Sequence, residues 1–475
     1  MRKPCPAGDC WKYSAGPDNN SILGLVMKIA VIGCGYVGLV SGTCLASLGH
    51  TVIGVDVDKR RVEALTRGEV PIYEPGLSEL ITAQTAQGRL RFTTDTAMAV
   101  QASATIFVAV GTPPSPAGGA DLSMLYASVE EIARTADGPK TLVIKSTVPP
   151  GTGEEVARRV KTCKHRIEVV NNPEFLREGT AIQDFMQPDR IVFGANTHEG
   201  LAALREIFQP LIDRGFAIFS MSRASAELSK FAANAMLAMR ISFVNELSLL
   251  AANIGADIES VRVGIGTDKR IGPGFLKAGV GYGGSCFPKD VAALVYQMQQ
   301  FGIEPYLLGG VEKVNQRQKL VFARRILQAV KDSPKPHIAV WGLAFKSDTD
   351  DMREAPSVDI IKSLVSAGAV VRAYDPQGMA NAKKMLGDII TWTSGVDECT
   401  RGADAVAVIT DWPEFITQDW HRIAGLMRGK HIFDGRNCLA SGRVAAAGLY
   451  YHAVGRPELE PGSGKPGSMG VVSAG

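Results

Sequence analysis

The stretch that decides the fold is MKIAVIGCGYVGLV, residues 27–40. It opens with a short and nearly continuous apolar run, which is typical of a buried parallel strand. Directly after that run, Gly33, Gly35 and Gly38 form the pattern G-x-G-x-x-G at the start of a helical pattern. In this context the glycines let the backbone approach a pyrophosphate at a helix N-terminus, so the stretch predicts a dinucleotide-binding βαβ unit.

The second strand of that unit bears on which dinucleotide binds. It is TVIGVD, and it ends at Asp56. A carboxylate at this position accepts hydrogen bonds from ribose hydroxyls and repels a 2′-phosphate, which favours NAD over NADP. Lys59, Arg60 and Arg61 follow closely and could weaken that preference. NAD is the interpretation that the residues favour.

Similar patterns continue along the chain. The runs ATIFVAVG, TLVIKST and IEVVNNP are further buried strands, mostly separated by helical patterns. From Ser222 to about Asn253, an apolar face with helical spacing predicts one long helix. After the break DSPKP, HIAVWGLAF and VVRAYDP repeat the order of strand, glycine turn and strand ending in Asp. The predicted fold class is α/β, with two Rossmann-like doubly wound domains joined by a central long-helix segment.

Chain length supports a division into several domains, because 475 residues exceed one ordinary hydrophobic core. The predicted parts are a disordered extension (1–26), an NAD-binding Rossmann domain (27–221), a central helical segment (222–331), a C-terminal Rossmann-like domain (332–455) and a disordered tail (456–475). The two end segments are rich in Gly, Pro and polar residues and lack the apolar periodicity of a folded domain.

The composition excludes several function classes. The net charge is only +3 and no long basic block is present, so nothing indicates nucleic acid. Residues 22–40 are the most apolar early stretch, but Lys28 and the glycines interrupt it, so neither a signal peptide nor a membrane span is predicted. The eight cysteines show no CxxC pair and no metal-ligand spacing, which favours reduced thiols in the cytoplasm and no metal site.

Two proline-containing loops are candidate parts of a site. VAVGTPPSP (108–116) and KSTVPPGT (145–152) each follow a buried strand. Their position is therefore the carboxyl edge of the sheet, where ligands of such folds bind, and Thr112 and Thr147 are the candidate contacts. The alternative is that the prolines only fix two turns for folding.

The segment NPEFLREGTAIQDFMQPDR, residues 172–190, carries several charges just beyond another strand end. Glu174, Arg177, Glu178 and Asp184 form either a solvated face or part of a site. The residues alone leave these two interpretations open.

On the long helix, Lys230 and Asn234 are four residues apart and share one face. Their neighbours are mostly apolar or small. Because a buried lysine is costly without a partner, this pattern indicates a functional role such as stabilising an oxyanion. The alternative is a lysine whose charged end extends to water.

The string GVGYGGSCFPKD, residues 279–290, places Cys286 after a glycine-rich turn and four residues before Asp290, with Lys289 nearby. If Ser285 or Cys286 caps a helix, backbone N–H groups and positive charge lower the thiol pKa and make the thiolate available. An isolated cysteine is more often an inert buried side chain. The glycines, the flanking charges and the cofactor fold favour a nucleophile here.

In order along the chain, these motifs resemble the UDP-glucose/GDP-mannose dehydrogenase family. The resemblance runs from Met27 to about Gly455 and rests on GCGYVG, VAVGTPP, KSTVPPGT, NPEFLREGTA, ELSKFAANAMLAMRISFVNE, RIGPGFLKAGVGYGGSCFPKD and GLAFKSDTDDMREAP. It implies an NAD-binding domain, a central segment with dimer contacts and the cysteine loop, and a C-terminal UDP-binding domain, with the active site between them. A homodimer or higher homo-oligomer follows, without a nucleic-acid or membrane partner.

The resemblance also implies a role for each matching residue. The catalytic set would be Cys286 as nucleophile, Lys230, Asn234 and Asp290 as its neighbours, and Thr147 and Glu174 as groups that position water. The cofactor contacts would be Gly33, Gly35, Tyr36, Val37, Gly38, Asp56, Arg61, Thr112, Thr147, Glu178, Lys289 and Arg353. The substrate contacts would be Glu174, Phe175, Leu176, Arg177, Glu178, Lys230, Asn234, Phe275, Leu276, Lys277, Ala278, Gly279, Gly283 and Lys346, with Arg270 reaching the substrate from the partner subunit.

The reaction that the resemblance implies is the NAD-dependent twofold oxidation of UDP-glucose to UDP-glucuronate. It would pass through a thiohemiacetal and a thioester on Cys286, which water hydrolyses. The first proton acceptor stays open. The alternatives are the same chemistry on GDP-mannose or a UDP-N-acetylhexosamine, a non-catalytic sensor of NAD or a nucleotide sugar, and a single-step hydroxy-acid dehydrogenase that needs no cysteine.

Overall fold

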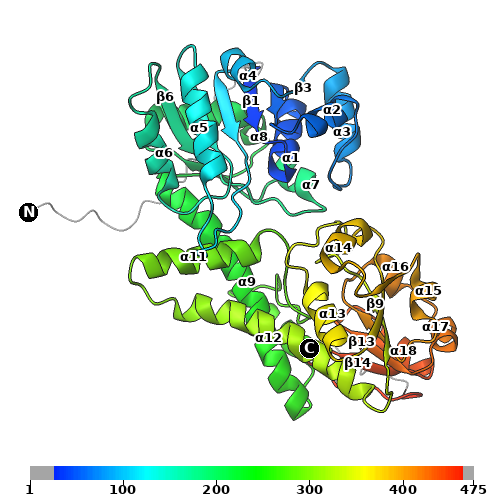
Figure 1. The fold of residues 1–475 in the computed structure, drawn as a ribbon. Coiled ribbons are helices and arrows are strands. Elements are labelled where there is room, and N and C mark those ends of the chain that lie inside the picture. Colours follow the sequence, from blue (N-terminus) through cyan, green and yellow to red (C-terminus); the bar gives the residue numbers. More distant parts are fainter. Residues whose placement is uncertain (1–25, 464–475) are drawn as a thin grey trace, which may run out of the picture. The chain divides into compact units, whose positions relative to one another are not determined.

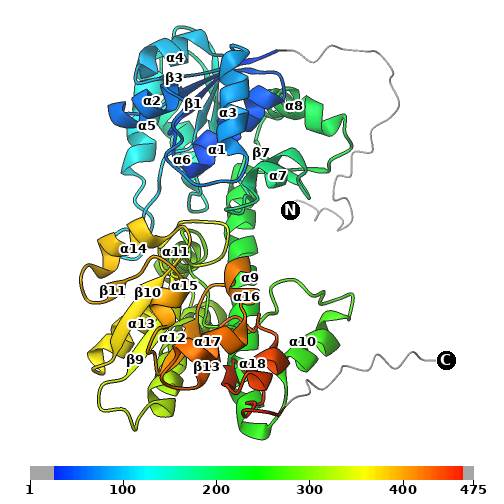
Figure 2. The same cartoon turned by 90° about the vertical axis from the view of Figure 1, so that its right-hand side faces the viewer.

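A computed structural model of the chain describes residues 26–463. The chain divides into two compact units that meet in sequence between Ala232 and Ala233. We refer to them as the N-terminal and C-terminal units, and both are of the α/β class (Figures 1 and 2). Of the two end segments predicted to be disordered, residues 1–25 and 464–475 lie outside the described residues.

The N-terminal unit is built on an eight-stranded sheet with the order β3-β2-β1-β4-β5-β6-β7-β8. Its strands are β1 (Lys28–Ile32), β2 (Thr51–Val55), β3 (Leu90–Thr93), β4 (Thr105–Val108), β5 (Lys140–Ile144), β6 (Ile167–Asn171), β7 (Ile191–Gly194) and β8 (Ile218–Met221). Neighbouring strands are parallel except β6 and β7. The order reverses direction between β1 and β4, and such a switch point is where doubly wound folds bind nucleotides.

Helices cover both faces of this sheet. They are α1 (Tyr36–Ser47), α2 (Lys59–Thr66), α3 (Leu77–Ala86), α4 (Thr96–Ala102), α5 (Ser123–Thr135), α6 (Thr152–Val160), α7 (Ala181–Met186) and α8 (His198–Ile212). Successive residues of a strand point to opposite faces. Ile29 and Val31 of β1 therefore pack with α1, α3, α7 and α8, whereas Ala30 and Ile32 pack with α4, α5 and α6. Burial on both faces explains why the strands are continuous apolar runs.

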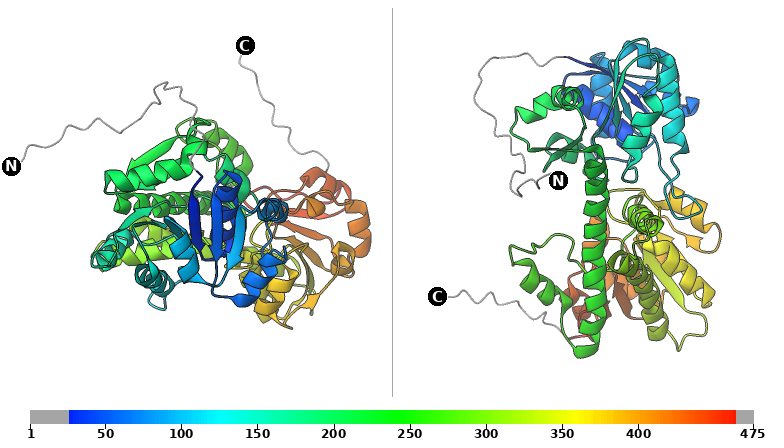
Figure 3. Two further views of the ribbon diagram at one scale, coloured as in Figure 1. Left: turned by 90° about the horizontal axis from the view of Figure 1, so that it is seen from above. Right: turned by 90° about the vertical axis from the view of Figure 1, so that its left-hand side faces the viewer.

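Helix α9 (Arg223–Ile254) is the predicted long helix, and it is 32 residues long (Figure 3). Among residues 26–463 it is the single helix long and apolar enough to cross a membrane, with a mean hydropathy of 1.4 in its most apolar stretch, 39% of which is buried. Near its start, Glu227 and Lys230 are buried against polar partners of the N-terminal unit. Such pairing is typical of a helix within a folded protein core.

The C-terminal unit contains a six-stranded parallel sheet with the order β11-β10-β9-β12-β13-β14. Its strands are β9 (His337–Trp341), β10 (Val370–Tyr374), β11 (Thr391–Trp392), β12 (Ala405–Val408), β13 (His431–Asp434) and β14 (Tyr450–Ala453). Its helices, besides most of α9, are α10 (Ile258–Gly266), α11 (Phe287–Gln300), α12 (Tyr306–Ala329), α13 (Pro356–Ser366), α14 (Met379–Leu386), α15 (Val396–Thr400), α16 (Pro413–Ile416), α17 (Trp420–Leu426) and α18 (Ser441–Ala446). The order matches the first six strands of the other sheet, so this unit is also Rossmann-like.

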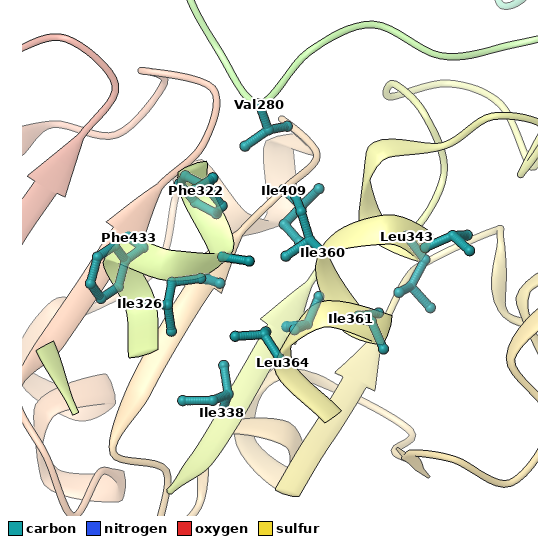
Figure 4. Close-up of a cluster of buried hydrophobic side chains, with 14 of the residues drawn as sticks. Val280, Phe322, Ile326, Ile338, Leu343, Ile360, Ile361, Leu364, Ile409 and Phe433 are labelled. Carbon is teal, nitrogen blue, oxygen red and sulfur yellow. The ribbon is translucent and has the colours of Figure 1, made fainter. Parts of the chain in front are cut away.

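One buried cluster joins the cysteine-bearing loop to the core of the C-terminal unit. Val280, from the glycine-rich loop before Cys286, packs in the same cluster as Phe322 of α12 and Phe433 of β13 (Figure 4). Phe322 and Phe433 meet edge to face, with ring centroids 6.2 Å apart. The loop is thereby anchored at one end in rigid structure.

The predicted fold class is confirmed, and three differences have physical causes. Strands β3 and β8 are at the edges of the sheet and are half exposed, so they lack the apolar run by which buried strands are predicted. Strand β7 is buried but only four residues long. The predicted tail is wrong for residues 456–463, because Arg456 pairs with Asp257 at 3.2 Å and Leu459 pairs with Tyr451 beside β14.

Candidate functional site

The glycine-rich turn after β1 lies at the switch point of the N-terminal sheet. Gly33 has φ +97°, and a Cβ there would lie 2.7 Å from the Ala109 carbonyl oxygen. A Cβ on Gly38 would lie 1.8 Å from the Gly33 carbonyl oxygen, whereas one on Gly35 would meet nothing within 4 Å. No side chain caps α1, so its first N–H groups have no capping partner from a side chain, and the space beside Gly35 is open. This turn fits a pyrophosphate group at a helix N-terminus.

Asp56 is fixed beside the same turn and is 6% exposed. Its Oδ2 accepts a hydrogen bond from the Cys34 amide at 2.9 Å and pairs with Arg61 Nη1 at 2.9 Å. The predicted cofactor residues Asp56 and Arg61 are therefore together at the end of β2. Tyr36 and Val37 begin α1 and are half-buried, and the Tyr36 hydroxyl donates to Glu74.

The two proline-containing loops meet at the ends of β4 and β5, which are adjacent strands. The Thr112 hydroxyl donates to the Thr147 carbonyl oxygen at 2.7 Å, and the Ser146 hydroxyl donates to the Val110 carbonyl oxygen at 2.7 Å. The structure thus brings Thr112 and Thr147 together, as their position after neighbouring strands predicts. The Thr112 hydroxyl holds the two loops to each other, which also supports the structural interpretation of these turns.

Lys230 and Glu174 form a buried ion pair in the N-terminal unit. Lys230 Nζ lies 2.9 Å from Glu174 Oε1, and both side chains are 4% exposed. Burial alone would raise the pKa of Glu174, but the charge and hydrogen bond of Lys230 and the Leu176 amide hold it below its usual value. The alternative of a lysine that extends to water is therefore wrong. Two cations lie near the Phe175 ring, with Arg190 Cζ 3.8 Å and Lys230 Nζ 5.3 Å from its centroid.

The sequence left open whether the charges of residues 172–190 form a solvated face or part of a site, and the structure shows charges of both kinds. Glu174 is buried, whereas the Arg177 side chain is 63% exposed and pairs with Asp184 at 2.5 Å. Glu178 is half-buried in the same loop. One strand end therefore supplies both an interior carboxylate and a surface ion pair.

In the C-terminal unit, Asn234 and Asp290 are joined by a buried hydrogen bond. Asn234 Nδ2 donates to Asp290 Oδ2 at 2.6 Å, and Lys289 Nζ lies 2.6 Å from Asp290 Oδ1. Asn234 is 6% and Asp290 1% exposed. Both Asp290 oxygens therefore accept hydrogen bonds, which holds the carboxylate in one orientation.

Cys286 is half-buried and occupies the N-cap position of α11. Its carbonyl oxygen accepts a hydrogen bond from the Asp290 amide at 2.9 Å, so the two residues define the first turn of the helix. Ser285 Oγ lies 3.5 Å from Cys286 Sγ. Of the two residues that the sequence offered as the start of a helix, Cys286 takes the N-cap position, without a capping hydrogen bond from its side chain. A thiolate at this position lies near the positive end of the helix dipole.

The loop before Cys286 contains the predicted substrate contacts 275–279 and Gly283, and these residues differ in exposure. Leu276 and Ala278 are 2% exposed, so their side chains belong to the core. Phe275 is 38% exposed and has φ +59°, a left-handed conformation that is uncommon for a phenylalanine. Lys277 is exposed, and the Gly279 amide donates to Asn245 Oδ1 at 2.8 Å.

The remaining predicted contacts lie on surface loops of the C-terminal unit. The Arg270 side chain is 88% exposed and pairs with Asp268 at 2.6 Å. Lys346 Nζ lies 5.6 Å from the Phe345 ring centroid. The Arg353 side chain pairs with Asp351 at 2.8 Å, and its carbonyl oxygen accepts from the Gly284 amide at 2.8 Å.

Arg353 and Gly283 belong to segments that touch. A Cβ on Gly283 would lie 2.3 Å from the Glu354 carbonyl oxygen, so only glycine fits there. The loop after β9 therefore packs against the cysteine-bearing loop. Within residues 26–463, no three His, Cys, Asp or Glu side chains are placed together as metal ligands.

Four further charged residues near these groups were not predicted from the sequence; Lys145, Glu227 and Glu74 are buried, and Arg436 is half-buried. Lys145 directly follows β5 and is 4% exposed, and burial lowers its pKa to about 8. Its Nζ donates to Asn172 Oδ1 at 2.8 Å. Arg436, in the loop after β13, donates to the carbonyl oxygens of Gly281 and Phe345 at 3.2 and 2.7 Å. The sequence did offer one indication for Lys145, namely a charged residue at the end of a buried strand.

Glu227 and Glu74 are the other two. Glu227 is 2% exposed, precedes Lys230 by three residues on α9, and accepts hydrogen bonds from the Gly151 and Gly153 amides at 2.7 and 2.6 Å. Burial raises its pKa to about 7, against the opposing effect of these amides. No local pattern marks either glutamate, because all their partners are distant in sequence.

Comparison with known proteins places this geometry in a family. Three domain descriptions of the UDP-glucose/GDP-mannose dehydrogenase family match the chain: the NAD binding domain over residues 27–212, the central domain over 224–317 and the UDP binding domain over 339–441. The chain belongs to this family. Membership confirms the predicted family and, with its NAD binding domain, the predicted cofactor.

Individual family members are similar over nearly their whole length. UDP-glucose 6-dehydrogenase of Rhizobium meliloti (strain 1021) is 44% identical, and the alignment covers 91% of this chain and 100% of the relative. A UDP-glucose dehydrogenase structure from the archaeon Pyrobaculum islandicum has a TM-score of 0.85 at 37% identity, covering 94% and 100% of the two chains. A UDP-D-ManNAc dehydrogenase structure from Pyrococcus horikoshii has a TM-score of 0.80 at 26% identity, covering 90% and 99%.

Proposed function

We propose that this chain oxidises UDP-glucose twice with NAD, giving UDP-glucuronate through a covalent intermediate on Cys286. The observation that carries the proposal is the position of Cys286, which begins α11 one turn before Asp290, itself buried and bound by Asn234. The relatives named as UDP-glucose dehydrogenases, at 44% and 37% identity, support the substrate.

NAD fits the turn after β1, because the space beside Gly35 is open and no side chain caps α1, while Gly33 and Gly38 permit the close packing of the turn. When bound, NAD would accept one hydride from the substrate carbon, so the twofold oxidation would use two NAD molecules in turn. Asp56 would orient the ribose. The other proposed cofactor contacts are Tyr36, Val37, Arg61, Thr112, Thr147, Glu178, Lys289 and Arg353.

The covalent step begins after the alcohol has lost a hydride and a proton to become an aldehyde. The Cys286 thiolate adds to the aldehyde carbon, forming a carbon–sulfur bond and leaving negative charge on oxygen. We propose that Lys230 and Asn234, one helical turn apart on α9, donate to that oxygen. Loss of a second hydride from the same carbon leaves a thioester.

Hydrolysis completes the reaction. Water attacks the thioester carbon, the carbon–sulfur bond breaks, and the carboxylate and free thiol are released. Glu174 is suited to accept the proton of this water, because Lys230 keeps its pKa below the usual value and so keeps it ionised at neutral pH. Asp290 and Thr147 are the proposed groups that orient the water.

The proposed substrate contacts come from two loops, from helix α9 and from the loop after β9. They are residues 174–178 with Lys230 and Asn234, and residues 275–279 with Arg270, Gly283 and Lys346. The buried Leu276 and Ala278 would contribute backbone groups rather than side chains.

The test is Cys286→Ser, with Cys163→Ser as a control for the same substitution at another half-buried cysteine. We expect Cys286→Ser to bind NAD and UDP-glucose and to release no UDP-glucuronate, while the control turns over normally. Normal steady-state turnover by Cys286→Ser would overturn the covalent mechanism.

The rival substrates, GDP-mannose and a UDP-N-acetylhexosamine, would use the same chemistry. The lower identity to the UDP-D-ManNAc dehydrogenase, 26%, favours UDP-glucose. NADH formation with a panel of nucleotide sugars decides among them. Two NADH per substrate excludes a single-step hydroxy-acid dehydrogenase, and any NADH formation excludes a sensor.

We also propose a homodimer that buries one face of α9. Leu228, Met236, Phe243, Leu250 and Ile254 are large apolar side chains of this helix and are 47–67% exposed. Exposed apolar side chains in such number favour a protein interface, and mass measurement in solution tests it. The six free cysteines among the described residues favour a reducing compartment, the cytoplasm.

A further inference from the structure

Glu74 is a buried carboxylate that the proposed mechanism does not use. It lies in the segment between α2 and α3 and is 6% exposed. Its Oε2 accepts hydrogen bonds from the Tyr36 hydroxyl and from the Gly179 amide, the latter at 2.6 Å, and its Oε1 accepts from the Ala181 amide at 2.8 Å. One side chain thus has three donors from two distant segments.

The three donors belong to segments with separate roles. Tyr36 is the first residue of α1, inside the glycine pattern that fits the pyrophosphate. Gly179 and Ala181 flank Thr180, the N-cap of α7, whose side chain makes no capping hydrogen bond. They end the loop that carries Glu174, the buried partner of Lys230. Glu74 therefore stands between the cofactor turn and this loop.

All three hydrogen bonds are accepted by the two oxygens of one carboxyl group. Burial, the Glu74 hydrogen bond and the Glu74 charge raise the pKa of Tyr36, so the phenol stays protonated and donates. The two amides are backbone donors at the start of α7, where negative charge is favourable. A neutral amide side chain offers one acceptor oxygen and places its NH2 group against a donor, so it cannot hold all three.

We infer that Glu74 is a positioning residue that fixes the cofactor turn, through Tyr36, and the loop of Glu174, through Gly179 and Ala181, relative to each other. The part that concerns the loop rests on the proposed function, because it assigns Glu174 to the reaction. The part that concerns the cofactor turn rests on NAD binding alone.

The test compares Glu74→Gln, Tyr36→Phe and their double variant, with Glu69→Gln as a control. Glu69 lies in the same segment, pairs with Arg67 at the surface and is 61% exposed, so the control removes the same charge. NAD affinity is measured by titration without substrate. KM for UDP-glucose, kcat and Tm are measured on the same preparations.

We expect Tyr36→Phe to weaken NAD binding about fivefold and to leave the KM for UDP-glucose unchanged, since it removes one charge-assisted hydrogen bond. Glu74→Gln is expected to weaken NAD binding and raise the KM for UDP-glucose, each by about tenfold, because it also releases the loop. The double variant should bind NAD no more weakly than Glu74→Gln. The control should match the unmodified enzyme.

Two results would overturn the inference. One is a Glu74→Gln enzyme with a lower Tm but unchanged NAD affinity and unchanged KM, because this result would mean that Glu74 only stabilises the fold. The other is full additivity in the double variant, which would mean that Tyr36 and Glu74 act separately. If Glu74→Gln does not fold, Tyr36→Phe still decides, because it leaves both backbone hydrogen bonds of Glu74 in place.

The proposed function fails in a different way. If the unmodified enzyme forms no NADH from UDP-glucose, the assignment of the substrate is wrong. The NAD titration of Tyr36→Phe and Glu74→Gln would still test the role of Glu74 at the cofactor turn.

Discussion

Replacing Lys230 with methionine should separate the catalytic and structural roles of the buried ion pair. The substitution keeps most of the side-chain volume but leaves Glu174, 4% exposed, without its partner at 2.9 Å. Breaking a buried ion pair by removing one member typically costs about 3–5 kcal/mol of stability. For a unit of this size, that corresponds to a fall in Tm of roughly 6–20 °C.

The loss should depend on pH with a definite sign. In the unmodified protein the pKa of Glu174 lies below its usual 4.5, so its stabilising contribution is present above that pH and is lost as pH falls through the folded pKa. Without Lys230, burial should raise the pKa above 4.5. Stability is then greatest below 4.5 and falls as pH rises through the new pKa. The Tm difference between the two proteins should be larger at pH 8 than at pH 5.

The assay pairs thermal unfolding with initial rates of NADH formation. Lys230→Met should lower kcat by about 10²–10³-fold, the effect of losing one donor to an oxyanion. The double variant Lys230→Met/Glu174→Gln removes the unpaired charge, so it should recover Tm at pH 8 and stay inactive. Equal Tm losses at both pH values, with no recovery in the double variant, would refute the reasoning.

Three further outcomes follow from contacts described above. Gly38→Ala should prevent NAD binding, because its Cβ would lie 1.8 Å from the Gly33 carbonyl oxygen; tight NAD binding by a folded variant would contradict this. Because the pKa of Glu227 is raised from 4.5 to about 7, the free energy of unfolding should fall by roughly 3 kcal/mol as pH rises from 4.5 to 7. Glu227→Gln should abolish this part of the pH dependence of the unfolding free energy, as measured by denaturant titration at several pH values. Asn234→Asp would replace a hydrogen bond to Asp290, now 2.6 Å long, with repulsion between two carboxylates, so turnover at pH 8 should fall at least about 100-fold. Asn253→Asp, at an exposed position of the same helix, is the control and should not alter turnover.

The fold could be predicted from the sequence because its main signals are local. Strands such as β1 and β4 are buried on both faces and therefore form continuous apolar runs, and α9 shows its helical spacing directly. The edge strands β3 and β8 escaped because half-exposed strands mix polar and apolar residues. The end of the ordered chain was misplaced because Arg456 is held by Asp257, a residue far away in sequence.

The candidate site was predictable only where residues are close in sequence. The i, i+4 spacing of Lys230 and Asn234, and the turn from Cys286 to Asp290, are visible in the sequence as such. The partners are not, because Lys230 pairs with Glu174 and Asn234 with Asp290 across separations of 56 residues each. Chemistry alone also could not separate Glu174 from Arg177, two charges in one loop with opposite burial.

The boundary between the two units falls inside α9, between Lys230 and Asn234. This boundary is therefore a poor place to join or divide engineered chains. A chimera or a split enzyme divided at Ala232 would place two proposed oxyanion donors on different polypeptides, and would interrupt the single helix that sets their spacing. Recombination between relatives with different sugar preferences should therefore transfer α9 whole, together with the loop that supplies Glu174.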